Sequence, residues 1–213
     1  SPPPPPKKKK KKKKQVSIFT CVVTTRKSTN SFAIISEDLC HDAAHACLAL
    51  EKVKEWVEDN VAVYSYVTYV SDGAASHFKN RYQLHQFAKD DCPQAQWLFS
   101  ASGHGKNACD GVGGLVKHQA TLNNLRERSV SAIQTARTMV SVLSKKLKGV
   151  HLVYLDENEV VRYREQKKEE WLTVRAFPGI QSWHAWRLSK SSTEGTCDVY
   201  VARTVGSAWK QLY

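Results

Sequence analysis

Two aspartates, Asp72 and Asp110, lie in the segments of this chain best suited to chemistry. Asp72 belongs to the segment SDGAASHFKN (71–80), and Asp110 lies 38 residues later, in SGHGKNACDGVGGLVK (102–117). Carboxylates brought together from separate elements bind divalent cations, and such ions activate an oxygen nucleophile for attack on a phosphodiester. The pair therefore predicts nucleic-acid chemistry, with Asp72 and Asp110 as catalytic metal ligands and Mg²⁺ or Mn²⁺ as the ion.

The elements around these acids are expected to bring them to the ends of a strand and a helix. The β-branched run 61–70 predicts a strand that ends at Asp72, at the sheet edge where open α/β sheets bind ligands. Asp110 is expected to begin a helix over 110–127, where the helix dipole also favours a carboxylate. Each acid therefore has an ordinary alternative, a turn residue for Asp72 and an N-cap for Asp110.

Three basic residues near the acids are candidates for binding phosphates. Lys79 and Arg81 fall on a helix expected over about 75–87, directly after Asp72. Lys117 lies two turns after Asp110 on the same helix face. We expect all three side chains to contact nucleic acid.

Two further candidates, His104 and Lys106, lie in the glycine-rich segment between the acids. This segment differs from a nucleotide-binding P-loop, because Ser100 takes the place of the first glycine and Asn107 replaces the final Ser or Thr. We expect a loop that presents His104 and Lys106 to a phosphate, with two solvated side chains as the alternative.

The two segments resemble the retroviral-integrase-like, ribonuclease-H-fold transposase family, and more closely the transposon-derived proteins of animal genomes. The shared phrases are SDGxxSxFKN, which 71–80 matches, and SHGKxxxDGxGGxVK, which 102–117 matches apart from Gly103 inserted before His104. The resemblance covers residues 15–119 well and the rest in outline. It implies an α/β fold, namely a truncated ribonuclease-H-like mixed sheet with flanking helices, and a position facing DNA for Lys117.

The expected order of elements follows this resemblance with the opening strand absent. A small C-terminal β module, resembling the basic barrel that follows many integrase cores, is expected after a highly charged segment at 157–170. The expected domains are a Pro/Lys tail at 1–14, the core at 15–150 and the module at 151–213. The expected elements are a hairpin (16–24 and 31–36), helices (42–58, 75–87, 110–127 and 130–148) and strands (61–70, 96–100, 171–175, 181–188 and 197–204).

The resemblance implies an ancestral Mg²⁺-dependent polynucleotidyl transferase that cleaves and joins DNA. Such sites use a third acid on the opening strand, where this sequence has proline and lysine, and 16–24 contains no acid. Glu37 and Asp38 lie near the sheet edge, but no motif assigns either of them the role. We therefore expect an N-terminally truncated, inactive fragment.

Composition places most of the positive charge outside the globular part. The formal charge is +12, of which Lys7 to Lys14 supply eight, leaving +4. The tail 1–14 is expected to be extended, either as a nuclear-targeting or DNA-binding arm or as a homopolymer tract without dedicated function. We expect DNA as the partner, a nuclear location or otherwise a cytoplasmic one, and no membrane association, and the sequence leaves the oligomeric state open.

The alternative is a non-catalytic DNA-binding or interaction module that uses the tail and an aromatic β segment for its contacts. That segment comprises Trp171, Trp183, His184 and Trp186. Tryptophans stack on exposed bases, although at such spacing they are more commonly core residues. The six widely spaced cysteines are expected to be reduced. A zinc site at Cys40, His41, His45 and Cys47 is less expected than an ordinary helix start, because further paired ligands are not evident.

Overall fold

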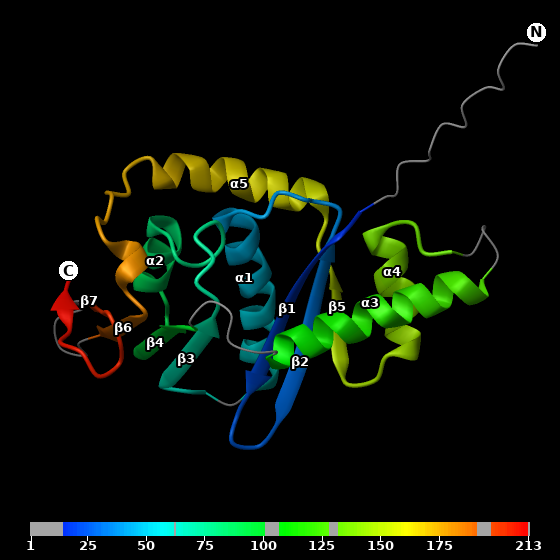
Figure 1. Ribbon diagram of the computed structural model, residues 1–213, viewed down its shortest axis with the longest axis horizontal. Helices are drawn as coiled ribbons and strands as arrows, with labels where there is room; N and C mark the ends of the chain where they lie inside the picture. The colour runs from blue at the N-terminus through cyan, green and yellow to red at the C-terminus, as the bar shows by residue number, and fades with distance from the viewer. Residues whose placement is uncertain (1–14, 62, 101–106, 128–131, 191–196, 213) are drawn as a thin grey trace, which may run out of the picture.

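The computed structural model describes residues 15–61, 63–100, 107–127, 132–190 and 197–212. His104, Lys106 and the tail 1–14 lie outside these residues. The described chain is mixed α/β, with helices packed around two separate sheets (Figure 1). A ribonuclease-H-like fold with a single mixed sheet is not confirmed by this arrangement.

The first sheet has three strands, in the order β1-β2-β5. β1 (Ser17–Thr24) and β2 (Thr29–Ser36) form the antiparallel hairpin that the sequence predicts, and β5 (Val150–Tyr154) pairs parallel to β2. The turn is held by Thr25, whose Oγ1 accepts a hydrogen bond of 3.0 Å from the Ser28 N–H. β1 is therefore an outer strand, paired on one side with β2.

The second sheet has five strands, in the order β3-β4-β6-β7-β8. β3 (Tyr66–Ser71) and β4 (Gln94–Phe99) are parallel, and the rest pair antiparallel: β6 (Ala185–Lys190), β7 (Cys197–Ala202) and β8 (Lys210–Gln211). The expected separate module at 151–213 is therefore corrected: β5 joins the first sheet, and β6 to β8 extend the second from β4. The strand expected at 171–175 is also wrong, because these residues end a helix and continue as a turn.

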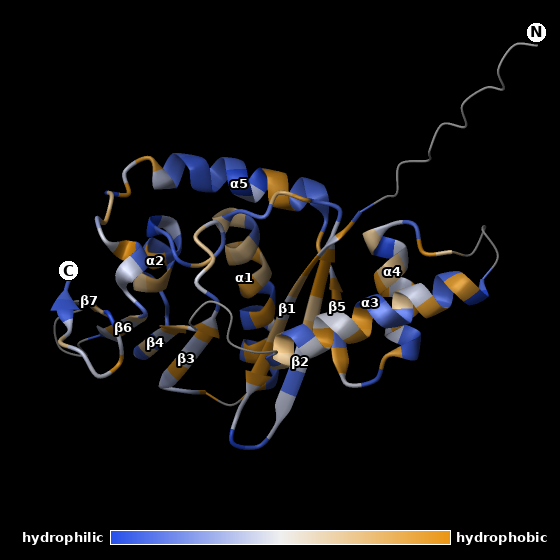
Figure 2. Cartoon of the chain, in the orientation of Figure 1, coloured by the Kyte–Doolittle hydropathy of each residue, from blue (hydrophilic) through white to orange (hydrophobic). Residues whose placement is uncertain are grey.

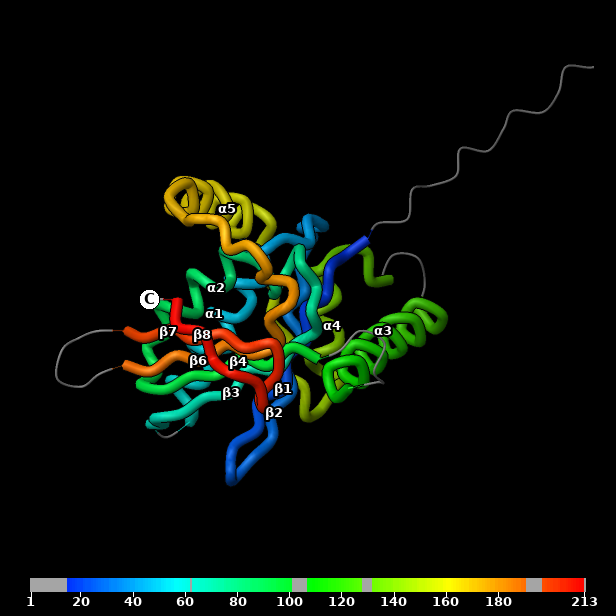
Figure 3. Tube along the Cα trace, turned by 60° about the vertical axis from the view of Figure 1, so that its left-hand side comes forward, coloured from blue at the N-terminus to red at the C-terminus, as the bar shows by residue number. Residues whose placement is uncertain are grey.

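Helices cover both faces of the three-stranded sheet, because apolar side chains of β2 point alternately to one face and to the other. Phe32 and Ile34 pack toward α1 (Ala43–Asn60) and α5 (Glu157–Trp171), whereas Ala33 and Ile35 pack toward α3 (Ala108–Arg126) and α4 (Ala136–Lys146). Successive side chains of a strand point to opposite faces. Figure 3 shows α5 and α3 on opposite sides of the hairpin.

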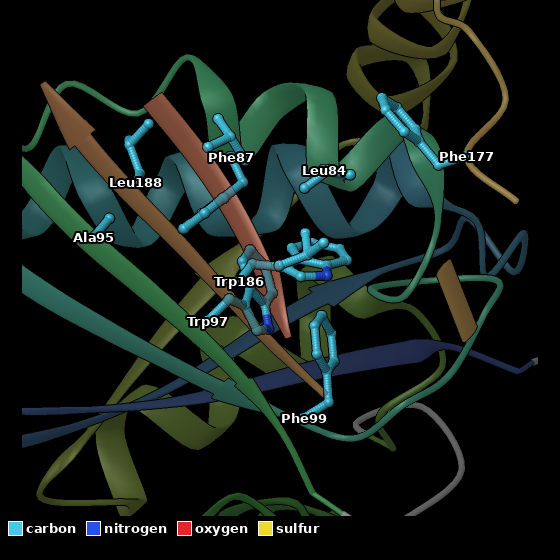
Figure 4. Close-up of a cluster of buried hydrophobic side chains, with 10 residues drawn as sticks. Leu84, Phe87, Ala95, Trp97, Phe99, Phe177, Trp186 and Leu188 are labelled. Atoms are coloured by element: carbon cyan, nitrogen blue, oxygen red, sulfur yellow. The ribbon is translucent and has the colours of Figure 1, made fainter. Parts of the chain in front are cut away.

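α2 (Arg81–Ala88) covers the five-stranded sheet and contributes to its core. Phe87 of this helix packs with Trp97 of β4 and Trp186 of β6, and their ring centroids lie 5.9 to 6.0 Å apart (Figure 4). Trp186 is fully buried. The C-terminal strands thus share one hydrophobic core with the α2 region.

The helix α5 is not predicted by the sequence, because its residues lack an apolar stripe. It is mostly hydrophilic (Figure 2), and only Val160 and Trp171 are buried. Polar contacts hold it: Arg164 binds Asp38 at 2.9 Å and Asp42 at 2.5 Å. No helix among the described residues is long and apolar enough to cross a membrane.

Glu170 at the C-terminal end of α5 predicts an acid-sensitive contact. Burial alone would raise its pKa, but hydrogen bonds from Lys167 (2.7 Å) and Lys89 (2.6 Å) prevail and lower this pKa from 4.5 to about 2. A lowered folded-state pKa gives stability that is present above pH 4.5 and is lost as pH falls toward about 2. We expect Glu170→Gln to reduce the fall in unfolding free energy over this pH range.

Urea denaturation at several pH values measures this effect. Glu165→Gln, at an exposed position of the same helix, is the matched control and should leave the pH dependence unchanged. Equal acid sensitivity in the two variants would contradict the role given to Glu170. Asp42, Asp90 and Asp156, whose pKa values are also lowered, are expected to contribute to the acid sensitivity that remains.

Candidate nucleic-acid interface

Asp72 is exposed and directly follows β3. Its Oδ1 accepts a hydrogen bond of 3.2 Å from the Ala74 N–H, which forms a local turn at Gly73. The Ser100 N–H, at the end of β4, donates to the Ser71 carbonyl at 2.9 Å. The ends of β3 and β4 therefore lie together, and the segment that leads to Asp110 starts beside Asp72.

Asp110 is exposed and lies in the first turn of α3, so the ordinary alternative of an N-cap does not hold for it. Asn107 is the N-cap, and its Oδ1 accepts a hydrogen bond of 3.0 Å from the Asp110 N–H. In return, Asp110 Oδ2 accepts one of 3.0 Å from the Asn107 N–H. This reciprocal capping box satisfies two backbone donors that the helix itself leaves unpaired.

The segments that carry the two acids both contact β1. Phe78, six residues after Asp72, packs against Phe19 with ring centroids 6.1 Å apart. On α3, a methyl group at Gly113 would lie in ordinary van der Waals contact with Thr20 Cγ2, at 3.6 Å, which shows that this helix packs directly on β1. Asp72 reaches this region from the five-stranded sheet, whereas Asp110 reaches it from a helix on the three-stranded sheet.

The described residues do not complete a metal site around these acids. Each carboxylate already binds a backbone N–H, and no group of three or more His, Cys, Asp or Glu among the described residues is placed to hold a metal ion. Two-metal phosphoryl transfer needs several carboxylates that hold both ions. The described residues therefore do not fit the expected Mg²⁺ or Mn²⁺, and we derive no step through such an ion.

The two acids that could complete the set have structural partners. Glu37 Oε1 accepts a hydrogen bond of 2.6 Å from the Ala136 N–H at the start of α4. Asp38 is buried and accepts hydrogen bonds from His45 Nδ1 at 2.8 Å and from Arg164 at 2.9 Å. Both therefore anchor helices to the end of β2.

The four residues considered for zinc belong to this same helix start. Asp42 caps α1, the helix expected over 42–58, by accepting a hydrogen bond of 2.9 Å from the His45 N–H. Buried Cys47 donates its thiol to Gln83 Oε1 at 3.1 Å, and burial raises the pKa of this thiol to about 12. These contacts give Asp42 and Cys47 structural roles at the start of α1, and no group of three or more His, Cys, Asp or Glu among the described residues is placed to hold a metal ion.

The basic candidates differ in whether they reach the surface. Lys79 is only 2% exposed; its Nζ lies 3.3 Å from His184 Nδ1 and over the Phe99 ring, and burial lowers its pKa. As placed, Lys79 packs inside the fold and does not reach a phosphate, contrary to expectation. Arg81 is half-buried and donates to the Tyr82 hydroxyl at 2.8 Å, whereas Lys117 is exposed on α3.

The aromatic segment proposed for stacking on bases is largely part of the core. Trp186 is fully buried, and Trp171, 9% exposed, stacks on Tyr82 with ring centroids 4.7 Å apart. Trp183 is half-buried and packs against Phe177. Base stacking by Trp171 and Trp186 is therefore excluded in this structure.

The sequence motifs do not reveal one feature of the structure: positive and negative charges are separated between the helix layers on the two faces of the three-stranded sheet. Residues 107–149 contain seven Lys and Arg against two Asp and Glu, a net charge of +5, which exceeds the +4 of the whole chain after the tail. The opposite layer, α1 and α5, contains six basic against nine acidic residues, a net charge of −3. We call residues 107–149, which include α3 and α4, the basic layer; its exposed basic side chains among the described residues are Lys117, Arg126, Arg137, Lys145, Lys146 and Lys148.

The comparisons with known proteins give a family without a known activity. No curated protein and no solved structure matches the chain. A family model described as a domain of unknown function, DUF8701, matches residues 11–196, which include both aspartate segments, the whole three-stranded sheet, and β3, β4 and β6 of the five-stranded sheet. The chain therefore belongs to the DUF8701 family.

Proposed function

We propose that this chain is a transposase- or integrase-derived domain that binds DNA and does not cleave it. The observation that carries the proposal is the basic layer, which holds more net positive charge than the whole chain without its tail. Clustered Lys and Arg on one face provide the charge with which proteins bind the phosphate backbone. The resemblance of 71–80 and 102–117 to transposase phrases supports DNA as the polyanion, and the eight lysines of the tail add to the attraction and to the proposal of a nuclear location.

The loss of cleavage follows from the roles of the acids. Asp72 and Asp110 each shape the local backbone, and Asp38 and Glu37 hold helices in place. Cleavage requires acids that are free to hold an ion close to the attacking oxygen. The proposed protein therefore uses its inherited scaffold to bind DNA.

Retained metal-dependent cleavage and strand transfer is the second candidate. It is favoured by the exposure of both aspartates and by the contact of both their segments with β1. It needs at least one further ligand in addition to the described residues.

A cleavage assay distinguishes the two candidates. Incubated with Mg²⁺ or Mn²⁺ and labelled duplex DNA, the chain is expected to produce no strand transfer and no cleavage above the level of the Asp72→Ala variant. The reason is that loss of a ligand misplaces the attacking oxygen, which lowers the rate steeply. Robust cleavage that disappears in Asp72→Ala would establish the second candidate.

DNA binding by the same two proteins provides the matched control. Asp72→Ala and the unsubstituted chain should bind the duplex equally well, because Asp72 is outside the basic layer. A matching thermal unfolding transition shows that the variant is folded, so that a difference in cleavage reports on chemistry alone.

A further inference from the structure

We propose that the basic layer is the surface on which duplex DNA lies, with Lys117, Lys145 and Lys148 contacting backbone phosphates. This inference rests on the proposed function and assigns it to one face of the molecule. All three side chains are exposed; Lys117 and Lys145 belong to α3 and α4, two helices adjacent in space, and Lys148 lies just beyond the end of α4.

The packing of the basic layer fixes which side chains point outward. Val112 and Val116 of α3, together with Met139 and Leu143 of α4, are buried in one cluster against β2. The side chains on the other helix faces are consequently left to solvent. The buried Asn123 accepts a hydrogen bond from Lys146, which fastens the end of α4 to α3 and holds the neighbouring lysines close to the longer helix.

Acidic groups offer little compensation on this surface. α4 contains no acid, and α3 contains only Asp110, whose carboxylate accepts a hydrogen bond from its own capping residue. Ordinary helix chemistry explains part of the charge, because Lys145 and Lys146 lie in the last turn of α4, where the helix dipole favours cations. It does not explain Lys117 in the middle of α3 or Lys148 beyond the end of α4.

The length of α3 and the electrostatic field around the molecule also suit a DNA duplex. α3 has 19 residues and is therefore about 28 Å long, which matches roughly eight phosphates along one DNA strand. The acidic layer formed by α1 and α5 covers the opposite face of the same sheet. A polyanion is attracted to one side of such a molecule and repelled from the other, so the charge separation also orients the approach.

The test compares two triple variants of the full chain that lose the same charge. In the first, Lys117, Lys145 and Lys148 are replaced by glutamine; in the second, the exposed Arg162, Lys168 and Arg203 outside the basic layer are replaced by glutamine. The affinity for a labelled duplex is measured over a series of salt concentrations. Each phosphate contact adds about 0.9 to the slope of log affinity against log salt.

We expect the first variant to lose about two to three units of slope, because each lysine gives up one phosphate contact. The second variant should keep nearly the slope of the unsubstituted chain, and matching thermal unfolding of all three proteins confirms that they are folded. If the unsubstituted chain binds and the two variants have equal slopes, the assignment of this surface is overturned while DNA binding stands. If the unsubstituted chain does not bind the duplex at low salt, the proposed function and this inference both fail.

Discussion

Replacing Trp186 by alanine is expected to destabilise the whole chain by about 3–5 kcal/mol, the usual effect of deleting a large buried aromatic side chain. Trp186 is fully buried, and its ring centroid lies 4.6 Å from that of Phe99 and 5.9 Å from that of Trp97. The cavity left by alanine is lined by residues of α2, β4 and β6, so the lost packing contacts destabilise elements that are far apart in the sequence. Urea denaturation monitored by circular dichroism measures this loss of unfolding free energy.

The control and the shape of the transition make this prediction specific. Leu172→Ala removes a side chain that is 80% exposed and should change stability by less than about 0.5 kcal/mol. Because β6 pairs with β4, Trp186→Ala should shift a single cooperative transition. Loss of a separate C-terminal transition, with the remainder unchanged, would show that 151–213 folds as an independent module after all.

The second large effect concerns the tail. Deleting residues 1–14 removes eight lysines, and up to eight phosphate contacts correspond to about seven units of salt slope on duplex DNA. We expect the affinity at low salt to fall strongly and the slope to become much shallower. A slope that is unchanged by the deletion would rule out the tail as the main contact.

Local patterns explain which parts of the fold could be predicted. The hairpin follows from two β-branched runs around a polar turn, and α1 follows from the Asp42 cap and the spacing of apolar residues such as Val53. α5 could not be found in this way, because ion pairs to residues such as Asp42, more than a hundred positions away, stabilise it. The pairing of β6 with β4 is equally non-local, and no periodicity reveals which sheet a strand joins.

The candidate site also has some features that local sequence predicts and others that depend on residues distant in the chain. The turn at Asp72 and the helix start near Asp110 are local features, and the sequence locates both to within a few residues. The burial of Lys79 is not local, because it depends on His184 and Phe99 from two strands of the second sheet. The basic layer escaped prediction because α3 and α4 become one charged surface only when both pack on β2.

Binding of residues 15–213 to a labelled DNA duplex tests the central claim most directly, because it removes the tail and leaves the folded domain alone. At low ionic strength, about 50 mM salt, we predict measurable binding with a salt slope of about three, the contribution of Lys117, Lys145 and Lys148. No binding under these conditions, by a protein whose unfolding transition shows that it is folded, would contradict the account, because all DNA affinity would then belong to the lysine run.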